Sequence, residues 1–300
     1  GLILLQAANG SPLGLTAEIT FGNLAAGVGD YTDEVFDFYR PGGMSTSPNE
    51  IATVLGMFVP FFTILFFSKK NWFSQYLLAG FVLSSVLALF FTMARAVWIF
   101  VLVVLILDWL LVKKLNFEIE IPAIWLSLKK YLVLILTLIA PLALLRLGTL
   151  KTTFFSQAGG LAYRTAHLKI TLEQMKSHFF GLGLDNLQFQ MVRKYPCQFY
   201  LNDSTPAHNI LLQIGASFGF LGLISWLLFF YLILRGGCFI LKNSTKFPVN
   251  KQLLALASFS SVVVYLLVSQ AHPWLIKTPI YELFYLALAI LFFTDSSYNK

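Results

Sequence analysis

The sequence alternates long apolar runs with short polar connections, which is the pattern of a helical membrane protein. A helix needs roughly 17–25 apolar residues to cross a bilayer. Runs of about that length lie near 51–68, 74–92, 94–112, 131–148, 209–234, 252–270 and 279–294. The strand-like alternation typical of membrane barrels is absent. The pattern therefore predicts an all-α, polytopic membrane protein with about seven spans.

The longest apolar run, from Tyr76 to Val112, exceeds the length of one span. As a single helix it would measure about 55 Å, whereas the hydrocarbon core is about 30 Å thick. Thr92, Met93, Ala94 and Arg95 interrupt the run near its middle. The pairs Lys69-Lys70 and Lys113-Lys114 flank it and are expected on the same side of the membrane. Two spans joined by a tight turn at Arg95 satisfy both observations.

Composition and charge agree with this class and set an orientation. The chain is 57% hydrophobic and 12% charged, about half the charged fraction of a soluble domain. Its net charge is +7, and many of its basic residues lie in alternate short connections, which are expected to be cytoplasmic. These connections contain Lys69, Lys70, Lys113, Lys114, Lys129, Lys130, Arg235, Lys242, Lys246 and Lys251. The basic residues do not cluster on a soluble domain, so nucleic-acid binding has no support.

The spans and charges predict four regions along the chain. Residues 1–50 form the end of a preceding helix and a polar outer loop, and residues 51–148 form four transmembrane helices. Residues 149–207 form a long outer loop with an amphipathic helix, and residues 208–300 form three transmembrane helices. Residues 1–8 are too short to span and follow no Met, so we expect an N-terminally truncated chain.

The amphipathic helix in the outer loop is predicted at about 161–179 from a period near 100° per residue. One stripe is apolar and membrane-facing: Leu161, Leu168, Leu172, Met175 and Phe179. The adjacent stripe is polar: Arg164, His167, Thr171, Gln174 and His178. Two interpretations fit this arrangement. The polar stripe lines a cleft at the bilayer surface, or the helix is an ordinary interfacial helix whose basic residues meet lipid phosphates.

His208 and Asn209 follow a polar loop and lie at the start of the apolar run at 209–234. Pro206, two residues before His208, has a fixed φ that suits the approach to a helix. A histidine at the boundary between water and lipid can donate and accept protons near neutral pH. The alternative is that His208 only caps a transmembrane helix.

Two arginines outside the loop helix are further candidates for binding phosphate. Arg95 lies at the end of an apolar hairpin, where a guanidinium either snorkels to the interface or binds phosphate with its fork of donors. Arg40 precedes Pro-Gly-Gly and either binds a substrate or pairs with Asp37. No pair of histidines has a ligand spacing with a third donor, so neither a metal nor another cofactor is expected.

Several motifs in the chain occur in a characteristic order. Ala94-Arg95-Ala96 opens a helix, and Tyr163-Arg164 is followed by His178-Phe-Phe-Gly-Leu-Gly-Leu-Asp-Asn186. His208-Asn209 starts the next span, which contains Gly219-Phe-Leu-Gly222. Upstream, the loop at 40–49 begins with Arg40 and ends with Pro-Asn. In this order the motifs, over about residues 35–235, resemble the O-antigen ligase/polymerase family of bacterial envelope glycosyltransferases.

The chain departs from the family's usual motifs at two positions. Ala94 stands in place of the usual Ser, and Phe179 stands where Pro is common. Neither departure removes a charged group. Members of the family have more spans than this chain, which agrees with the expected truncation.

The resemblance implies a multi-pass protein of the bacterial inner membrane whose active site faces the periplasm. The donor would be a glycan on undecaprenyl diphosphate, and the acceptor a hydroxyl of lipid A core or of a growing glycan, transferred without a metal. Arg164, Arg95 and Arg40 would neutralise the diphosphate. His208 would take the proton from the acceptor hydroxyl. Secondary candidates are His167, Gln174, His178 and Asn209.

Other functions remain open at this point. A polymerase of the same family, which would extend a glycan chain, uses the same kinds of residue as a ligase. A small-anion transporter would also place Arg and His along a membrane pathway, but it favours ionisable groups in mid-span, where this sequence has almost none. A non-catalytic component of polysaccharide export is the third alternative.

Overall fold

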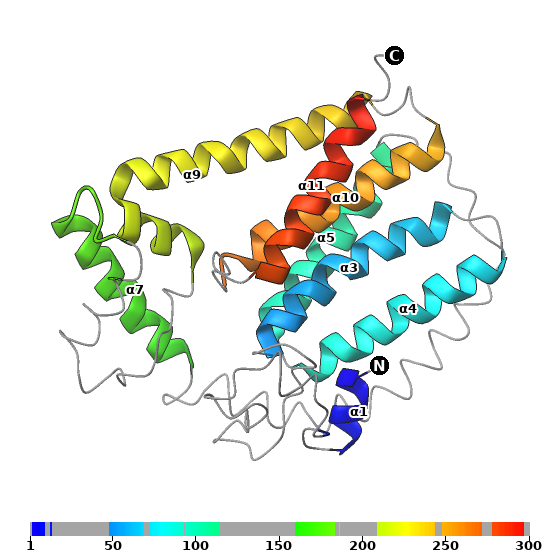
Figure 1. Ribbon diagram of the computed structural model, residues 1–300, viewed down its shortest axis with the longest axis horizontal. Coiled ribbons are helices and arrows are strands. Elements are labelled where there is room, and N and C mark those ends of the chain that lie inside the picture. Colours follow the sequence, from blue (N-terminus) through cyan, green and yellow to red (C-terminus); the bar gives the residue numbers. More distant parts are fainter. Residues whose placement is uncertain are drawn as a thin grey trace. The chain divides into compact units, whose positions relative to one another are not determined.

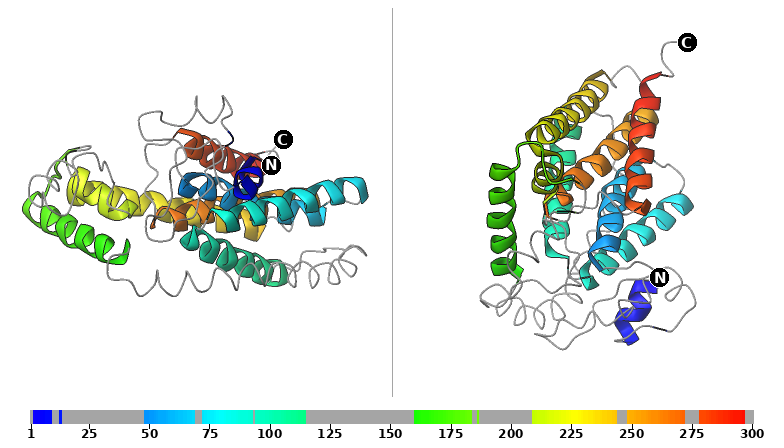
Figure 2. Two further views of the ribbon diagram at one scale, coloured as in Figure 1. Left: turned by 90° about the horizontal axis from the view of Figure 1, so that it is seen from below. Right: turned by 60° about the vertical axis from the view of Figure 1, so that its left-hand side comes forward.

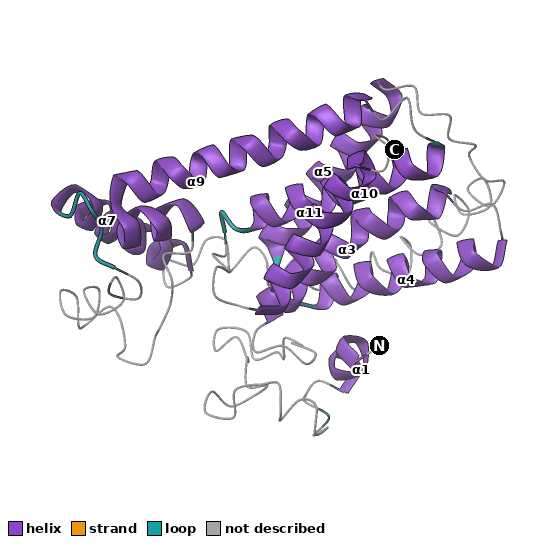
Figure 3. Ribbon diagram, turned by 45° about the horizontal axis from the view of Figure 1, so that its top comes forward, coloured by secondary structure: helices purple, strands orange, loops and turns teal. Residues whose placement is uncertain are grey.

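A computed structural model describes residues 2–9, 13, 48–68, 72–92, 94–114, 160–183, 186, 209–243, 248–271 and 278–296. The regular elements of this part of the chain are helices (Figures 1 and 3), which confirms the predicted all-α class. They are α1 (Leu2–Asn9), α3 (Pro48–Ser68), α4 (Trp72–Phe91), α5 (Arg95–Lys114), α7 (Gly160–Ser177), α9 (Ile210–Asn243), α10 (Val249–Val268) and α11 (Thr278–Ser296).

Among the described residues, 5 helices are long and apolar enough to cross a membrane, namely α3, α4, α5, α9 and α10. They coincide with the spans predicted at 51–68, 74–92, 94–112, 209–234 and 252–270. The run at 279–294 is helical as α11, although its described apolar stretch, Glu282–Phe292, is shorter than a span. The run at 131–148 lies outside the described residues. The chain is a multi-pass membrane protein.

The turn predicted at Arg95 separates α4 from α5. It is stabilised from both sides, because the Thr92 hydroxyl donates to the carbonyl of Leu89 at 2.7 Å and the Trp98 indole N–H donates to the same carbonyl at 2.9 Å. The rings of Phe90 and Trp98 stack with centroids 5.3 Å apart. Arg95 is the first residue of α5. The long apolar run therefore forms two helices, as its length required.

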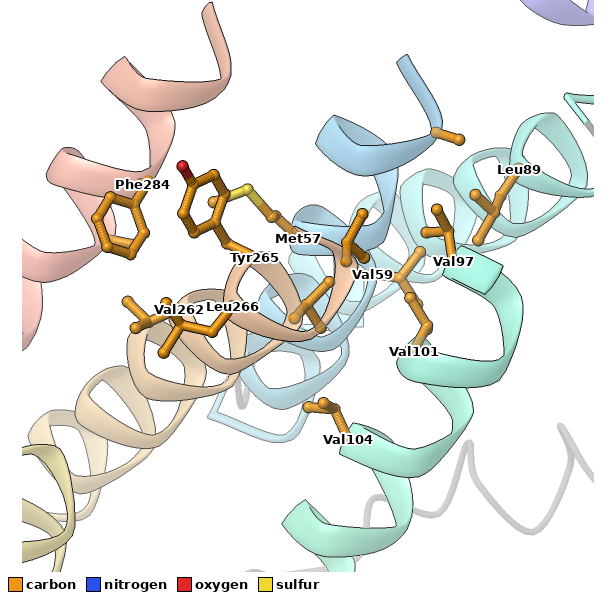
Figure 4. Close-up of a cluster of buried hydrophobic side chains, with 14 of the residues drawn as sticks. Met57, Val59, Leu89, Val97, Val101, Val104, Val262, Tyr265, Leu266 and Phe284 are labelled. Carbon is orange, nitrogen blue, oxygen red and sulfur yellow. The ribbon is translucent and has the colours of Figure 1, made fainter. Parts of the chain in front are cut away.

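The chain divides into two compact units, residues 1–119 with 227–300, and residues 120–226. In the first unit α10 packs against α3, α5 and α11 and is buried along most of its length, and α4 packs on α3 (Figure 2). Val97 and Val101 of α5, Val262 of α10 and Tyr265 stacked on Phe284 belong to its main apolar cluster (Figure 4). Helix α10 is thus the central helix of this unit.

A carboxyl group of α5 is buried between helices of the first unit. Asp108 of α5 is buried, and its Oδ1 lies 2.6 Å from the hydroxyl of Ser260 in α10. Its Oδ2 is buried without a hydrogen-bond partner. Acidic residues within membrane helices usually face the protein interior and pair there. Asp108 is therefore an interhelical polar contact that the sequence reasoning passed over.

Ser260→Ala should destabilise the protein, because it removes the hydrogen-bond partner of the Asp108 carboxyl. Leaving a buried polar group without its partner costs about 1–3 kcal/mol. Thermal unfolding of purified protein in detergent measures the change. Ser225→Ala is the matched control, because the Ser225 hydroxyl is exposed and bonds only to Leu221 of its own helix. Equal unfolding temperatures for the two variants would show that the Asp108 contact is unimportant.

Candidate functional site: the joint between α7 and α9

Helix α7 packs against the first part of α9 within the second unit. Gly215 of α9 leaves space for the side chain of Met175, since a Cβ at Gly215 would lie 2.9 Å from the Met175 sulfur. Thr171 and Gln174, beside Met175 on the helix, are buried. Met175 therefore contacts protein instead of joining the predicted membrane-facing stripe. The polar stripe is covered at Thr171 and Gln174, so no open cleft exists at these two positions.

Helix α9 is broken at Gly219, whose φ of 70° and ψ of −163° are not helical. In an unbroken helix the Phe220 N–H would donate to the carbonyl of Ala216. In this structure it donates to the carbonyl of Phe179 at 3.0 Å, while Ala216 accepts the N–H of Leu182 at 2.8 Å. The turn that follows α7 thus supplies hydrogen-bond partners where the break interrupts the helix. Figure 1 shows this turn beside the bend in α9.

A third bond completes this contact, which we call the α7–α9 joint and define as residues 179–183 with 216–220. The Gly183 N–H donates to the carbonyl of Ser217 at 2.9 Å. Non-helical backbone at membrane depth is tolerated only where its polar groups are satisfied within the protein. The three bonds of the joint pair the Phe220 N–H and the carbonyls of Ala216 and Ser217 at the break.

The joint needs glycine at two positions. Gly181 has φ 82° and Gly219 has φ 70°, in the left-handed region that L side chains rarely adopt. A Cβ at Gly219 would collide with the backbone of Phe179 and lie 2.6 Å from the carbonyl carbon of Phe180. A Cβ at Gly181 would collide with Ser217 and lie 2.5 Å from the Gly219 nitrogen. Only glycine permits this close approach of two backbones.

His178 directly follows the last residue of α7 and precedes the first residue of the joint. Its backbone N–H donates to Gln174 at 2.9 Å, and its carbonyl accepts the N–H of Gly181 at 2.9 Å. The side chain is exposed, and Nδ1 lies 2.9 Å from the hydroxyl of Ser177. The direction of that bond depends on which ring nitrogen carries the proton. The joint therefore holds an exposed imidazole at a fixed end of α7.

Asn209 caps the first turn of α9. Its side-chain Oδ1 accepts the backbone N–H groups of Leu211 at 2.9 Å and Leu212 at 3.2 Å. Its carbonyl accepts the Gln213 N–H at 3.0 Å, which is the first bond of the helix. Asn is one of the preferred residues at this position. Asn209 therefore supplies a side-chain cap to α9.

Residues 79–227 match the family model described as O-antigen ligase. The chain belongs to the O-antigen ligase family. No curated protein and no solved structure matches it. The matched segment runs from α4 through α5 and α7 to the joint and the first part of α9. It therefore includes all the motifs of the resemblance except the Arg40 loop.

The structure describes some of the predicted O-antigen ligase site residues and not others. Gln174, His178 and Asn209 belong to the second unit, whereas Arg95 belongs to the first unit and is half-buried. Arg164 and His167 lie in α7, but their side chains are outside the described residues. Arg40 and His208 also lie outside the described residues. Among the described residues, no three His, Cys, Asp or Glu side chains lie close enough together to hold a metal ion.

The sequence reasoning recognised the family's Gly-x-Gly and Gly-x-x-Gly motifs but missed what they do together. Gly181 and Gly183 are separated from Gly219 by more than thirty residues, and periodicity cannot pair them. The available signal was a glycine inside an apolar span at Gly219, because isolated glycines often mark a break or a close backbone approach. The joint is therefore a result of the tertiary structure.

The capping role of Asn209 gives a direct prediction. Asn209→Ala should lower the stability of the protein by about 1 kcal/mol, because two N–H groups of the first turn lose their acceptor. Asn209→Ser is the matched variant, since a Ser oxygen can accept the same bonds and should retain most of the stability. Chemical denaturation of both variants in detergent measures the difference. If Ser is as damaging as Ala, the amide of Asn209 does more than cap the helix.

Proposed function

We propose that this member of the O-antigen ligase family is a glycosyltransferase. It moves a glycan from undecaprenyl diphosphate to an acceptor hydroxyl on the outer face of the inner membrane. The observation that carries the proposal is the joint within the family segment. It ties the C-terminal end of α7, the helix in which Arg164 lies near the start, to the part of α9 that follows His208 and Asn209. Two segments with cationic and proton-accepting residues are thereby fixed together.

The chemistry of transfer requires two kinds of group, and the chain offers both. As the glycosidic bond breaks, negative charge develops on the leaving diphosphate, which the guanidinium groups of Arg164 and Arg95 neutralise. The acceptor hydroxyl must lose its proton as it attacks, and the His208 imidazole takes it. Arg40, His167 and His178 assist in holding the substrates. No metal is needed in this scheme.

The orientation of the protein is part of the proposal. The basic connections at 69–70, 113–114 and 242–251 are cytoplasmic by the charge rule. The loop at 149–207 and the start of α9 then face the periplasm, where a lipid-linked donor presents its glycan. The region at 51–148 contributes four transmembrane helices and that at 208–300 three.

Reconstitution tests the function directly. Purified protein in lipid vesicles is mixed with undecaprenyl-diphosphate-linked glycan and one acceptor at a time, either lipid A core or the glycan itself. Transfer to lipid A core identifies a ligase, and extension of the glycan identifies a polymerase. Absence of transfer to either acceptor would reject the glycosyltransferase. A non-catalytic component of polysaccharide export would behave in this way.

Arg164→Lys should reduce transfer by about tenfold or more, because an ammonium keeps the charge but cannot form the two parallel hydrogen bonds of a guanidinium to a diphosphate. Initial rates over a range of donor concentrations measure the loss. Arg235→Lys is the control, because Arg235 lies near the basic end of α9, with its guanidinium 6.0 Å from the ring centroid of Tyr231. Wild-type turnover in Arg164→Lys would mean that Arg164 only contacts lipid headgroups.

A further inference from the structure

Three phenylalanines form an exposed aromatic cluster at the joint. Phe180 is 77% exposed, Phe179 57% and Phe220 52%. The ring centroids of Phe179 and Phe180 are 5.2 Å apart, and those of Phe179 and Phe220 are 6.0 Å apart. Two of these rings come from the turn after α7 and the third from α9. We call this group the aromatic tip.

The aromatic tip is held in place by the backbone of the joint. The Phe220 N–H donates to the Phe179 carbonyl. Gly181 and Leu182, which follow Phe180, make the other bonds and the close contact described above. The joint therefore fixes the backbone from which the three rings project. A fixed exposed group of large apolar side chains marks a surface that meets another apolar phase.

Continuity with a membrane span indicates which phase that is. Phe220 begins the second segment of α9, residues 220–243, whose 24 residues measure about 36 Å and can cross a hydrocarbon core of about 30 Å. Leu221 and Ile224 continue the exposed apolar surface from Phe220 along the helix. Phe179 contacts Phe220, so the tip extends the lipid-facing surface of α9.

The exposed side chains of α7 include both apolar and charged residues. Leu168 and Leu172 are exposed on it, with Lys169, Glu173 and Lys176 beside them. Lysine stems can lie along an apolar surface while their ammonium groups reach lipid phosphates. This side of α7 leads directly to the aromatic tip at its C-terminal end.

We propose that Phe179 and Phe180 insert into the acyl chains of the bilayer beside α9 and anchor the C-terminal end of α7 to the membrane. The occupant of the surface is bilayer lipid. Anchoring keeps the exposed imidazole of His178 at the level of the lipid headgroups. The inference concerns the position of the tip and holds whether or not the chain transfers glycans.

A spin label at residue 180 tests the proposal in the full chain. Cys197 and Cys238 are replaced by Ser, Phe180→Cys is labelled, and the protein is reconstituted in phosphatidylcholine vesicles. Phe180 is the most exposed of the three rings, so its replacement should leave the joint intact. Collisions with oxygen, which concentrates in lipid, are compared with collisions with a water-soluble nickel complex.

The label at 180 should collide with oxygen and be protected from nickel, as a label at Ile224→Cys in the membrane span should be. A label at Glu173→Cys, on the polar side of α7, should give the opposite ratio. Free access of nickel to residue 180 would place the tip in water and overturn the proposal. Protection of residue 180 from both reagents would place it under protein and would overturn it equally.

Discussion

Replacement of His208 by Ala should lower glycan transfer by at least about a hundredfold, which is the low end of the effect expected for losing a general base. Expression and donor binding should remain, because the cap of α9 comes from Asn209. With wild-type protein, transfer should rise with pH through a single ionisation, because only the neutral imidazole accepts a proton. Initial rates in reconstituted vesicles across a pH series measure both effects.

His208→Asn separates the two interpretations of His208. An Asn side chain can cap a helix but cannot act as a general base near neutral pH. If the role is catalytic, this variant should be as inactive as His208→Ala while unfolding at the wild-type temperature. An active His208→Asn variant would end the proposed mechanism, because a local structural role would then suffice.

Gly219→Ala should reduce both stability and transfer. The new Cβ would collide with Phe179, and an Ala at φ 70° is strained. Either the side chain is accommodated by opening the joint or the helix reforms, and in both cases the three hydrogen bonds between residues 179–183 and α9 are lost, at about 0.5–1.5 kcal/mol each. Separation of α7 from α9 by about 1 Å is enough to lower turnover by about a hundredfold.

Two other glycines serve as matched comparisons for this prediction. Gly80 of α4 has nothing within 4 Å of the position of a Cβ, so Gly80→Ala should unfold no earlier than wild type. Gly183 has a positive φ, but its Cβ would meet only the Asn186 amide at 3.1 Å, so Gly183→Asn should have a milder effect. Unfolding temperature and single-turnover rate are measured for all three. A Gly219→Ala protein with wild-type values for both would show that the joint does not position the site.

The intramembrane Asp108 bears on the choice between an enzyme and a transporter. The sequence argument against transport relied on spans with almost no ionisable groups, and Asp108 is the exception that the structure locates. Its Oδ1 contacts the hydroxyl of Ser260 in the neighbouring helix α10. A single carboxyl that joins two helices has a structural explanation, and it adds no second group along a pathway.

The sequence by itself determined the class of the protein, most of its spans and its family. These features follow from local composition: a span is a run of apolar residues long enough for the bilayer, and the turn at Arg95 follows from the length of the run around it. The family motifs are short and lie in chain order, so they can also be read without a fold. A helix was predicted at 161–179, and one is observed at Gly160–Ser177.

The tertiary structure alone decided how these elements meet. The hydrophobic period of α7 separates polar from apolar residues, but it could not indicate that Thr171 and Gln174 would be buried or that Met175 would occupy the space at Gly215. The break at Gly219 is stable because residues 179–183, distant in sequence, supply the hydrogen bonds that it lacks. Such pairings depend on two backbones approaching each other in space, and this approach cannot be predicted from local sequence.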